Sequence, residues 1–338
     1  MSATDTSPGN TGPANIAGRE AAPPRPLWHV VLVRPETMTL LLLVLAVIVA
    51  SQLSPYFLDI SYILRSFTLS AEFAIVALVL TMVIIAGEID LSPAASMALS
   101  ACLFAWAQAS GVPMPLAIAV GLASGLAMGA LNAFMVISLQ LPSIIVTIGT
   151  LTLYRGLAQV IAGDKSIRVP EWFIGIDRVL VAGIPVPVLV FIACSVVLGL
   201  VLAGTIFGRQ IYQVGTNEVA AQHAGIRSRR IKLTLFLLIG FVAAVAGMMT
   251  ASRLGSVRYD LGLGGELQMV LMAMLGGTYI FGGRGTVLGT FLAAWLLVVV
   301  STGMTVANLL PAIQLTVLGV LLIVAIIATN FIYSRTQR

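Results

Sequence analysis

The stretch FGRQIYQVGTNEVAAQHAGIRSRRIK, residues 207–232, is a polar segment between two apolar runs that are each long enough to cross a bilayer. It contains a single acid, Glu218, and five basic residues, which are Arg209, Arg227, Arg229, Arg230 and Lys232. An excess of Lys and Arg beside membrane spans marks the cytoplasmic side. The stretch is therefore predicted to be a cytoplasmic loop that sets the orientation of the whole chain.

A short helix is predicted inside this loop. Asn217 is suited to cap its N-terminus, Glu218 would lie near the positive end of the helix dipole, and Gly225 is a natural C-terminal stop. The result is a surface helix of about two turns. Such a helix either contacts a cytoplasmic partner or belongs to a solvated loop that only orients the spans.

Composition places the chain in a membrane. Hydrophobic residues make up 59% and charged residues 9% of its 338 residues, and the mean hydropathy is +1.05. About a quarter of the residues of a soluble domain are charged. An all-α polytopic membrane protein in contact with lipid is therefore predicted. Membrane topology explains the net charge of +5 better than a nucleic-acid partner does.

The apolar runs predict about ten transmembrane helices, separated where charges, Pro and Gly cluster. They are residues 38–53, 67–86, 93–109, 115–139, 144–162, 184–207, 231–253, 266–280, 287–304 and 310–333. Residues 1–34 are expected to form a disordered cytoplasmic tail rather than a secretory signal, and residues 35–338 a single membrane domain. An even number of spans puts both termini in the cytoplasm.

The second long connection, residues 163–183, carries charges of both signs without an excess of either. Trp172 and Phe173 beside Pro170 predict a helix or turn at the outer membrane interface. The loop is either a landing surface for an extracytoplasmic partner or an interfacial anchor.

Two short breaks interrupt the apolar pattern on the predicted cytoplasmic side. One contains Gly87, Glu88, Asp90 and Ser92, and the other contains Gly276, Gly277, Gly282, Gly283, Arg284 and Gly285. Irregular backbone near membrane depth is tolerated where it is buried in protein or lines a watery cavity. These breaks therefore either shape a pathway or are ordinary tight turns in water.

Three stretches together resemble the ribose and monosaccharide branch of bacterial ABC importer permeases. The pattern GxNExAAxxxGI resembles the coupling loop of these permeases and is present as Gly215, Asn217, Glu218, Ala220, Ala221, Gly225 and Ile226. GEIDLS, residues 87–92, resembles a family motif that usually reads GGIDLS, and GGTYIFGGRGTVLG spans residues 276–289. With LYRG at residues 153–156, GEIDLS is similar to the rhamnose and autoinducer-2 branch.

The resemblance implies a type II ABC importer-like permease fold in the bacterial inner membrane, importing a monosaccharide or sugar-like solute. It also implies three protein partners: a second permease chain, alike or different, a cytoplasmic ATPase, and an extracytoplasmic sugar-binding protein. The residues expected to couple to the ATPase are Gly208, Arg209, Gly215, Asn217, Glu218, Ala221 and Gly225. Glu218, Ala221 and Gly225 are expected to lie in a groove of the ATPase, and the two breaks are expected to approach each other or the dimer axis.

Polar side chains inside spans are weaker candidates for a pathway. Asn132 and Thr147 could bond a sugar hydroxyl, although Thr commonly satisfies itself on a backbone carbonyl. Gly121, Gly125 and Gly129 recur every fourth residue, which favours close helix packing over a ligand role.

Neither a nucleotide-binding GxxxxGK[ST] pattern, nor metal-ligand spacing, nor a catalytic set occurs in the sequence. A transporter subunit without a cofactor is therefore predicted, with ATP hydrolysis on another chain. The alternative is a secondary transporter driven by an ion gradient. It would need acids deep in several spans, where only Glu72 qualifies.

Glu72 and Arg155 are charges stranded inside spans. At 1.5 Å per residue they would lie about 8 Å and about 10 Å below the outer face. An ion pair between them would lower the cost of burying both. In the alternatives, Arg155 reaches a backbone carbonyl or the solute, and Glu72 reaches the outer interface.

Overall fold

The chain is mostly helical in the computed structural model, which describes residues 35–53, 57 and 59–336. The helices are α2 (Pro35–Leu53), α3 (Ile60–Thr68), α4 (Ala71–Ile85), α5 (Pro93–Ala109), α6 (Met114–Ile137), α7 (Ser143–Ala162), α8 (Val186–Gly204), α9 (Ile206–Thr216), α10 (Glu218–His223), α11 (Ser228–Leu254), α12 (Gly265–Leu275), α13 (Val287–Val306) and α14 (Pro311–Thr336). The predicted all-α fold is confirmed. The predicted tail, residues 1–34, lies outside the described residues.

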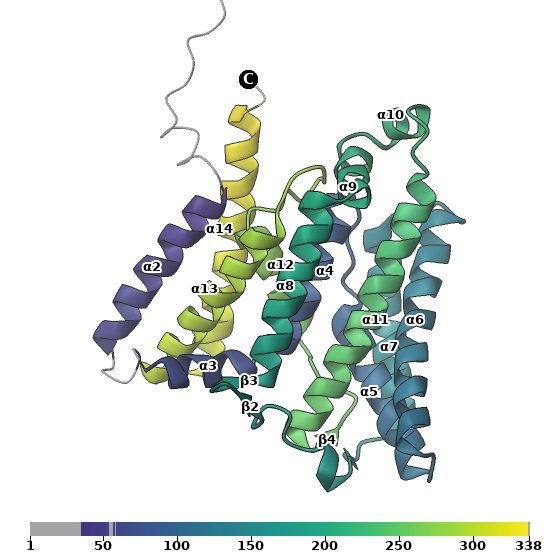
Figure 1. Ribbon diagram of the computed structural model, residues 1–338, viewed down its shortest axis with the longest axis vertical. Coiled ribbons are helices and arrows are strands. Elements are labelled where there is room, and N and C mark those ends of the chain that lie inside the picture. The colour runs from purple at the N-terminus through teal and green to yellow at the C-terminus, as the bar shows by residue number, and fades with distance from the viewer. Residues whose placement is uncertain (1–34, 54–56, 58, 337–338) are drawn as a thin grey trace, which may run out of the picture.

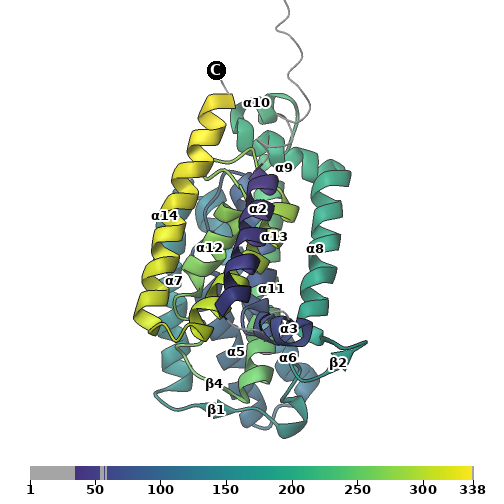
Figure 2. The ribbon, with the colours of Figure 1, turned by 90° about the vertical axis from the view of Figure 1, so that its left-hand side faces the viewer.

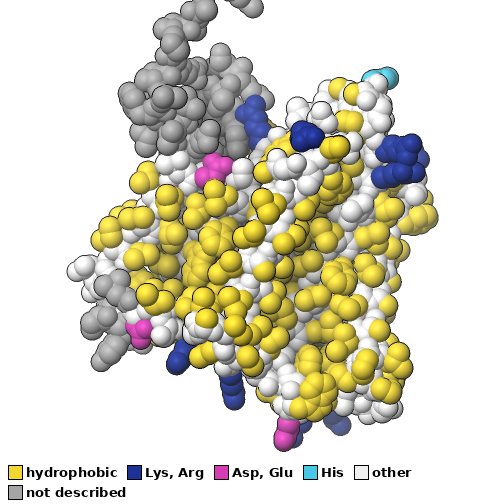
Figure 3. All heavy atoms as spheres, in the orientation of Figure 1, with side chains coloured by type: hydrophobic (Ala, Val, Ile, Leu, Met, Phe, Trp, Pro, Cys, Tyr) yellow, Lys and Arg dark blue, Asp and Glu magenta, His cyan; other side chains and the backbone are white. Residues whose placement is uncertain are grey.

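The long helices lie side by side, with α10 at one end of the molecule and α3 at the other (Figures 1 and 2). We call these the α10 end and the α3 end. Apolar side chains cover the face between them, while charged side chains gather toward the two ends (Figure 3). This distribution is that of a membrane protein, whose apolar belt faces lipid and whose ends face water.

Each of the ten predicted spans corresponds to a helix, although several are short. Among the described residues, five helices are long and apolar enough to cross a membrane alone: α6, α7, α8, α11 and α13. The bent pair α3 and α4 raises that number to six. The others are shorter in their described apolar part, and α12 has only 11 residues. The protein is thus polytopic.

The predicted span 67–86 is wrong at its start, because α3 and α4 meet there at an angle of 68°. Asp59 caps α3 by accepting a hydrogen bond from the Ser61 backbone N–H at 2.8 Å. The polar residues of α3 include Arg65, which is exposed, and water at the membrane surface satisfies them better than hydrocarbon does. The helix therefore lies across the α3 end instead of continuing α4.

The predicted span 184–207 also ends early. The Thr205 hydroxyl accepts a hydrogen bond from the Gly208 backbone N–H at 3.1 Å and so caps a separate helix, α9. Helix α9 was not predicted, because an apolar run does not reveal where one helix stops and the next begins in a new direction.

Helix α4 forms the centre of the core. It is apolar around its whole circumference, and 14 of its 15 residues are buried. A helix of this kind is stable only when neighbours surround it. Helices α8, α11 and α12 pack around it.

The seam between α6 and α11 is built on glycine. A Cβ at Gly125 would collide with the Gly240 carbonyl oxygen, and one at Gly129 with the Phe236 carbonyl oxygen. Gly121 faces Met248 and Phe104. The predicted packing role of the three glycines is confirmed, because two backbones can approach this closely only without side chains between them.

Replacing Gly129 with leucine is therefore expected to force α6 from α11 and to lower the yield of folded protein in detergent several-fold. The matched control is Gly149→Leu on α7, where an added Cβ meets nothing within 4 Å. Size-exclusion chromatography of both variants measures the effect. Equal yields would contradict this account of the seam.

The proposed ion pair between Glu72 and Arg155 is wrong. Arg253 Nε, in the last turn of α11, lies 2.9 Å from Glu72 Oε1. Arg155 instead donates from Nη1 to the Tyr259 and Leu261 carbonyl oxygens at 2.8 and 2.7 Å. The prediction counted residues along each span, which estimates how deep Glu72 and Arg155 lie in the membrane but not which helices are neighbours. At this depth the neighbour of α4 is α11.

Glu72 and Arg253 are expected to be strongly coupled, because the carboxylate is 1% exposed and loses its partner if Arg253 is replaced. In a double-mutant cycle on the melting temperature in detergent, Glu72→Gln and Arg253→Gln should show an interaction energy of about 1–3 kcal/mol. The cycle of Glu72→Gln with Arg155→Gln is the control and should be additive. Additivity in the first cycle would refute the coupling.

The connection at the α3 end contains the 3-10 turn η2 (Glu171–Phe173) and a hairpin of β2 (Leu180–Val181) and β3 (Ile184–Pro185). Strand β1 (Ile167–Arg168) pairs with β4 (Ser256–Val257), which follows α11. Phe173 packs on Phe104 with ring centroids 5.1 Å apart, while Trp172 is 71% exposed. The predicted turn at Trp172 and Phe173 is confirmed, and both uses proposed for it remain open.

Candidate functional site

The α10 end carries the predicted short helix. Asn217 Oδ1 accepts a hydrogen bond from the Ala220 backbone N–H at 2.9 Å, Glu218 occupies the first turn, and Gly225 has φ +83°. That positive φ lets the chain turn back toward α11 at no steric cost. The predicted capped helix and its stop are confirmed.

The exposed face of α10 differs from the expected one. Ala221 is only 5% exposed, and its carbonyl oxygen accepts a hydrogen bond from the Ile226 backbone N–H. Its side chain therefore packs inside this chain, so the expectation that Ala221 enters a groove of a partner is corrected. Val219, at 63% exposed, is the large apolar side chain that α10 presents outward.

Helix α9 connects α10 to both glycine breaks. The Gly283 backbone N–H donates to the Ile85 carbonyl oxygen at 2.8 Å, so the second break is bonded to the end of α4. A Cβ at Gly215 would collide with that same carbonyl oxygen, and one at Gly282 would lie 2.8 Å from Gly87 Cα. The prediction that the breaks approach each other is confirmed, and α9 packs on their junction.

The remaining glycines of this end are also at close approaches. Gly208 faces the Leu202 carbonyl oxygen, and Gly276 faces the backbone of Gly289 and Thr290. Gly277 has φ +82°. Arg209 is exposed. These positions build the backbone contacts of the α10 end, whereas Arg209 can face a partner.

Three charged side chains bind α10 to the first break. Lys232 Nζ, in the first turns of α11, lies 2.6 Å from both Glu88 Oε1 and Glu218 Oε2. The side chains of Lys232 and Glu88 are 13% and 11% exposed, and that of Glu218 is 38% exposed. We call these three residues the ionic triad. It gives Glu88 a defined partner.

The triad also affects the acidity of Glu218. Partial burial raises the pKa of Glu218, but its hydrogen bond to Lys232 and the positive charge of that residue outweigh burial and lower the pKa. Glu218 is therefore charged at neutral pH, and the triad is complete.

Asp90 holds the first break in shape. Its Oδ1 accepts hydrogen bonds from the Ser92 backbone N–H at 2.8 Å and the Ser92 hydroxyl at 2.7 Å. Asn132 Nδ2 donates to the Ser92 hydroxyl at 2.9 Å, and the Tyr154 hydroxyl donates to Asn132 Oδ1 at 3.1 Å. These bonds tie α5, α6 and α7 together.

Of the candidate pathway residues, Asn132 and Thr147 are 2% and 0% exposed in this chain. The Thr147 hydroxyl donates to the Ile89 carbonyl oxygen at 3.2 Å. Arg155 bonds two carbonyl oxygens. All three side chains therefore support the backbone, and none of them lines the cavity beside α10 or the cavity at the α3 end. Their assignment to a solute pathway stays a prediction.

Beside α10 lies a cavity of about 810 Å³, which we call the basic cavity. Its polar lining includes Arg227, Arg229 and Arg230, all exposed. Glu88, Glu218 and Lys232 of the ionic triad also line it. A partner that enters it would touch the triad directly.

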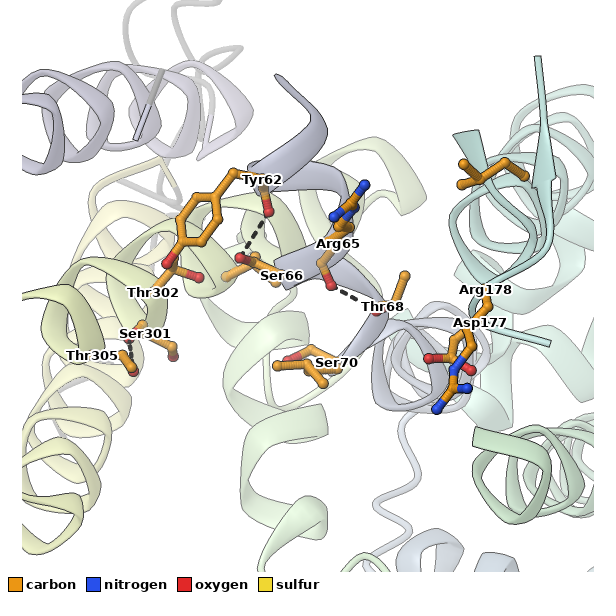
Figure 4. Close-up of a pocket in the computed structure, with 13 residues that line it drawn as sticks. Tyr62, Arg65, Ser66, Thr68, Ser70, Asp177, Arg178, Ser301, Thr302 and Thr305 are labelled. Carbon is orange, nitrogen blue, oxygen red and sulfur yellow. Dashed lines mark hydrogen bonds between the residues drawn. The ribbon is translucent and has the colours of Figure 1, made fainter. Parts of the chain in front are cut away.

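A second cavity, of about 800 Å³, opens at the α3 end between α3, the β2 hairpin and α13. Hydroxyl side chains and three charged residues line it, and Figure 4 shows them facing one another across the cavity. This site was not predicted from the sequence. The hydroxyl residues of α3 and of STGMT (residues 301–305) were the available signal, but both lay within or beside predicted spans.

Comparison with known proteins shows which proteins this chain resembles. Autoinducer 2 import system permease protein LsrD of Escherichia coli strain K12 and that of Shigella flexneri are each 32% identical to this chain over 303 residues, covering 88% of this chain and 92% of theirs. No solved structure matches. The predicted resemblance to ABC sugar permeases and to the autoinducer-2 branch is confirmed.

The model of the family described as "Branched-chain amino acid transport system / permease component" matches residues 62–326. That range includes both glycine breaks, α9, α10 and the ionic triad. The proteins it resembles are transporter components rather than enzymes. This chain, with its bundle of apolar helices and its two breaks joined at the base of α9, belongs to the branched-chain amino acid transport system permease component family.

Proposed function

We propose that this permease subunit of an ABC importer carries autoinducer 2, or a closely related sugar-derived solute, into the cytoplasm. The observation that carries the proposal is the 32% identity to the autoinducer 2 permease over 88% of this chain. The arrangement of α9 and α10 supports the proposal, because α10 is an exposed helix that α9 connects to both glycine breaks.

The α10 end is assigned to the cytoplasm and the α3 end to the outside. The arginines of the basic cavity support this orientation, since basic residues collect on the cytoplasmic side of membrane proteins. Both termini would then be cytoplasmic. A cytoplasmic ATPase would dock on Val219 and the neighbouring exposed face of α10, and a solute-binding protein would deliver from the α3 end.

Coupling follows from the contacts of α10. When the ATPase moves α10, helix α9 moves with it, because Asn217 joins them directly. Gly215 transmits that motion to the junction of the two breaks, and Lys232 transmits it to Glu88. A second permease chain would complete the pathway around these breaks.

Uptake of labelled autoinducer 2 and labelled ribose tests the solute. Cells lacking their own import systems would express this chain with its cognate ATPase and binding protein. The expected result is uptake of autoinducer 2 that stops with a catalytically inactive ATPase and survives collapse of the ion gradients. Uptake that survives the inactive ATPase but stops with an ionophore would instead identify a secondary transporter. Uptake of neither solute would reject the proposed substrate.

A further inference from the structure

We propose that the cavity at the α3 end is an entry site that holds the sugar-like solute before it passes into the membrane. The proposal rests on the proposed function and adds the place where the permease itself first binds the solute. The cavity, about 800 Å³, is within the range of small-molecule sites. We call it the entry cavity.

Hydrogen-bonding groups of both kinds line the entry cavity. Within the described part of the chain, the hydroxyls of Tyr62, Ser301 and Thr302 have no hydrogen-bond partner, and Arg65 and Arg178 have no ion pair. Asp177 Oδ1 is buried and unbonded there as well. In Figure 4, Tyr62 and Thr302 lie on one side and Asp177 and Arg178 on the other, with Arg65 between them.

A carboxylate on the lining of a cavity accepts hydrogen bonds, so a ligand that donates to Asp177 is stabilised. The hydroxyl groups of a sugar donate and accept in turn. A solute hydroxyl can donate to Asp177 while its own oxygen accepts from Arg65 or from the Thr302 hydroxyl. The ring of Tyr62 supplies an apolar surface beside these groups.

Arg65 and Arg178 outnumber Asp177, so the charge balance alone does not exclude an anion. The carboxylate of Asp177 accepts hydrogen bonds and repels negative charge, so it is the group that favours a hydroxyl-bearing solute over an anion. The open shape and large volume predict weak binding. Weak binding suits a transport pathway, because a solute held tightly at entry would not leave.

Protection of a cysteine from labelling tests the site without measuring transport. The chain has two cysteines, so Cys102→Ala and Cys194→Ala provide a cysteine-free background. Thr302→Cys in that background should be labelled by a membrane-impermeant maleimide added outside. We expect autoinducer 2 at tens of millimolar to slow this labelling at least threefold. Ser110→Cys, exposed at the same end but outside the cavity, is the control and should be labelled at an unchanged rate.

Asp177→Asn tests the same site in the complete transporter, with ATPase and binding protein present. This isosteric change is expected to lower the maximal uptake rate at least fivefold while the folded yield stays unchanged. Asp59→Asn, at the same end and outside the cavity, is the matched control, since asparagine also caps α3.

The outcomes separate the two proposals. Suppose that the parent transporter imports autoinducer 2, but that the solute at tens of millimolar does not protect Thr302→Cys and that uptake does not depend on Asp177. The entry cavity is then rejected and the proposed function stands. Protection by the binding protein alone, without solute, would identify the cavity as a protein-docking surface and overturn the proposal. Absence of labelling from outside would also overturn it. Uptake of neither solute by the parent transporter would reject the proposed substrate.

Discussion

Replacing Lys232 with methionine is expected to lower solute uptake about tenfold and to destabilise the protein. The change removes the cation from between Glu88 and Glu218, each 2.6 Å from Lys232 Nζ. It leaves two like charges without a cation between them, one of them 11% exposed. Breaking a buried pair costs about 3–5 kcal/mol, and the exposure of Glu218 reduces this to about 2 kcal/mol. Uptake in cells and the melting temperature in detergent measure the two effects.

The double variant Glu88→Gln, Lys232→Met is the control for this prediction. It removes the more buried carboxylate together with its cation, so the only charge left is Glu218, which is 38% exposed and reaches water. Stability should recover, while uptake stays low if the triad transmits the motion of α10. If Lys232→Met has the same uptake and melting temperature as the parent protein, the triad neither stabilises the fold nor couples the motion of α10 to transport.

The triad should also make the α10 end sensitive to acid. The pKa of Glu218 is lowered in the folded protein, so its contribution to stability is fully present above the ordinary glutamate value. That contribution is lost as the pH falls through the lowered pKa. The Lys232→Met variant should lose this contribution of Glu218 to the pH dependence of stability.

The change Val219→Glu is expected to uncouple ATP hydrolysis from uptake. Val219 is 63% exposed on α10, so a glutamate fits without disturbing the fold, but it places a charge in the apolar contact proposed for the ATPase. Uptake should fall at least tenfold, and the ATPase should copurify poorly with the variant. Val219→Leu keeps the apolar surface and should transport normally. Normal uptake by an inserted Val219→Glu protein would show that α10 does not dock there.

Ala221 shows why the face of α10 needed the structure. The sequence placed a helix there correctly, because Asn217 and Gly225 are local signals that act on neighbouring backbone. Which side of a six-residue helix is covered depends on α9 and α11, which pack on it from elsewhere. The sequence therefore predicted the helix and missed its exposed residue.

The sequence alone determined the class of the protein, the ten helical segments, and the close packing of Gly125 and Gly129. Apolar length, small residues and turn residues act over short distances along the chain, so the sequence shows their effects directly. The meeting of the two glycine breaks was only implied by the family resemblance, and the structure shows it. Only the tertiary structure decided that Glu72 binds Arg253 and that Glu88 binds Lys232. It also decided that α3 bends away from α4 to open the entry cavity. The physical reason is that the position of a residue along an apolar run indicates how deep it lies in the membrane. Which helix lies beside it depends on packing among helices far apart in the chain.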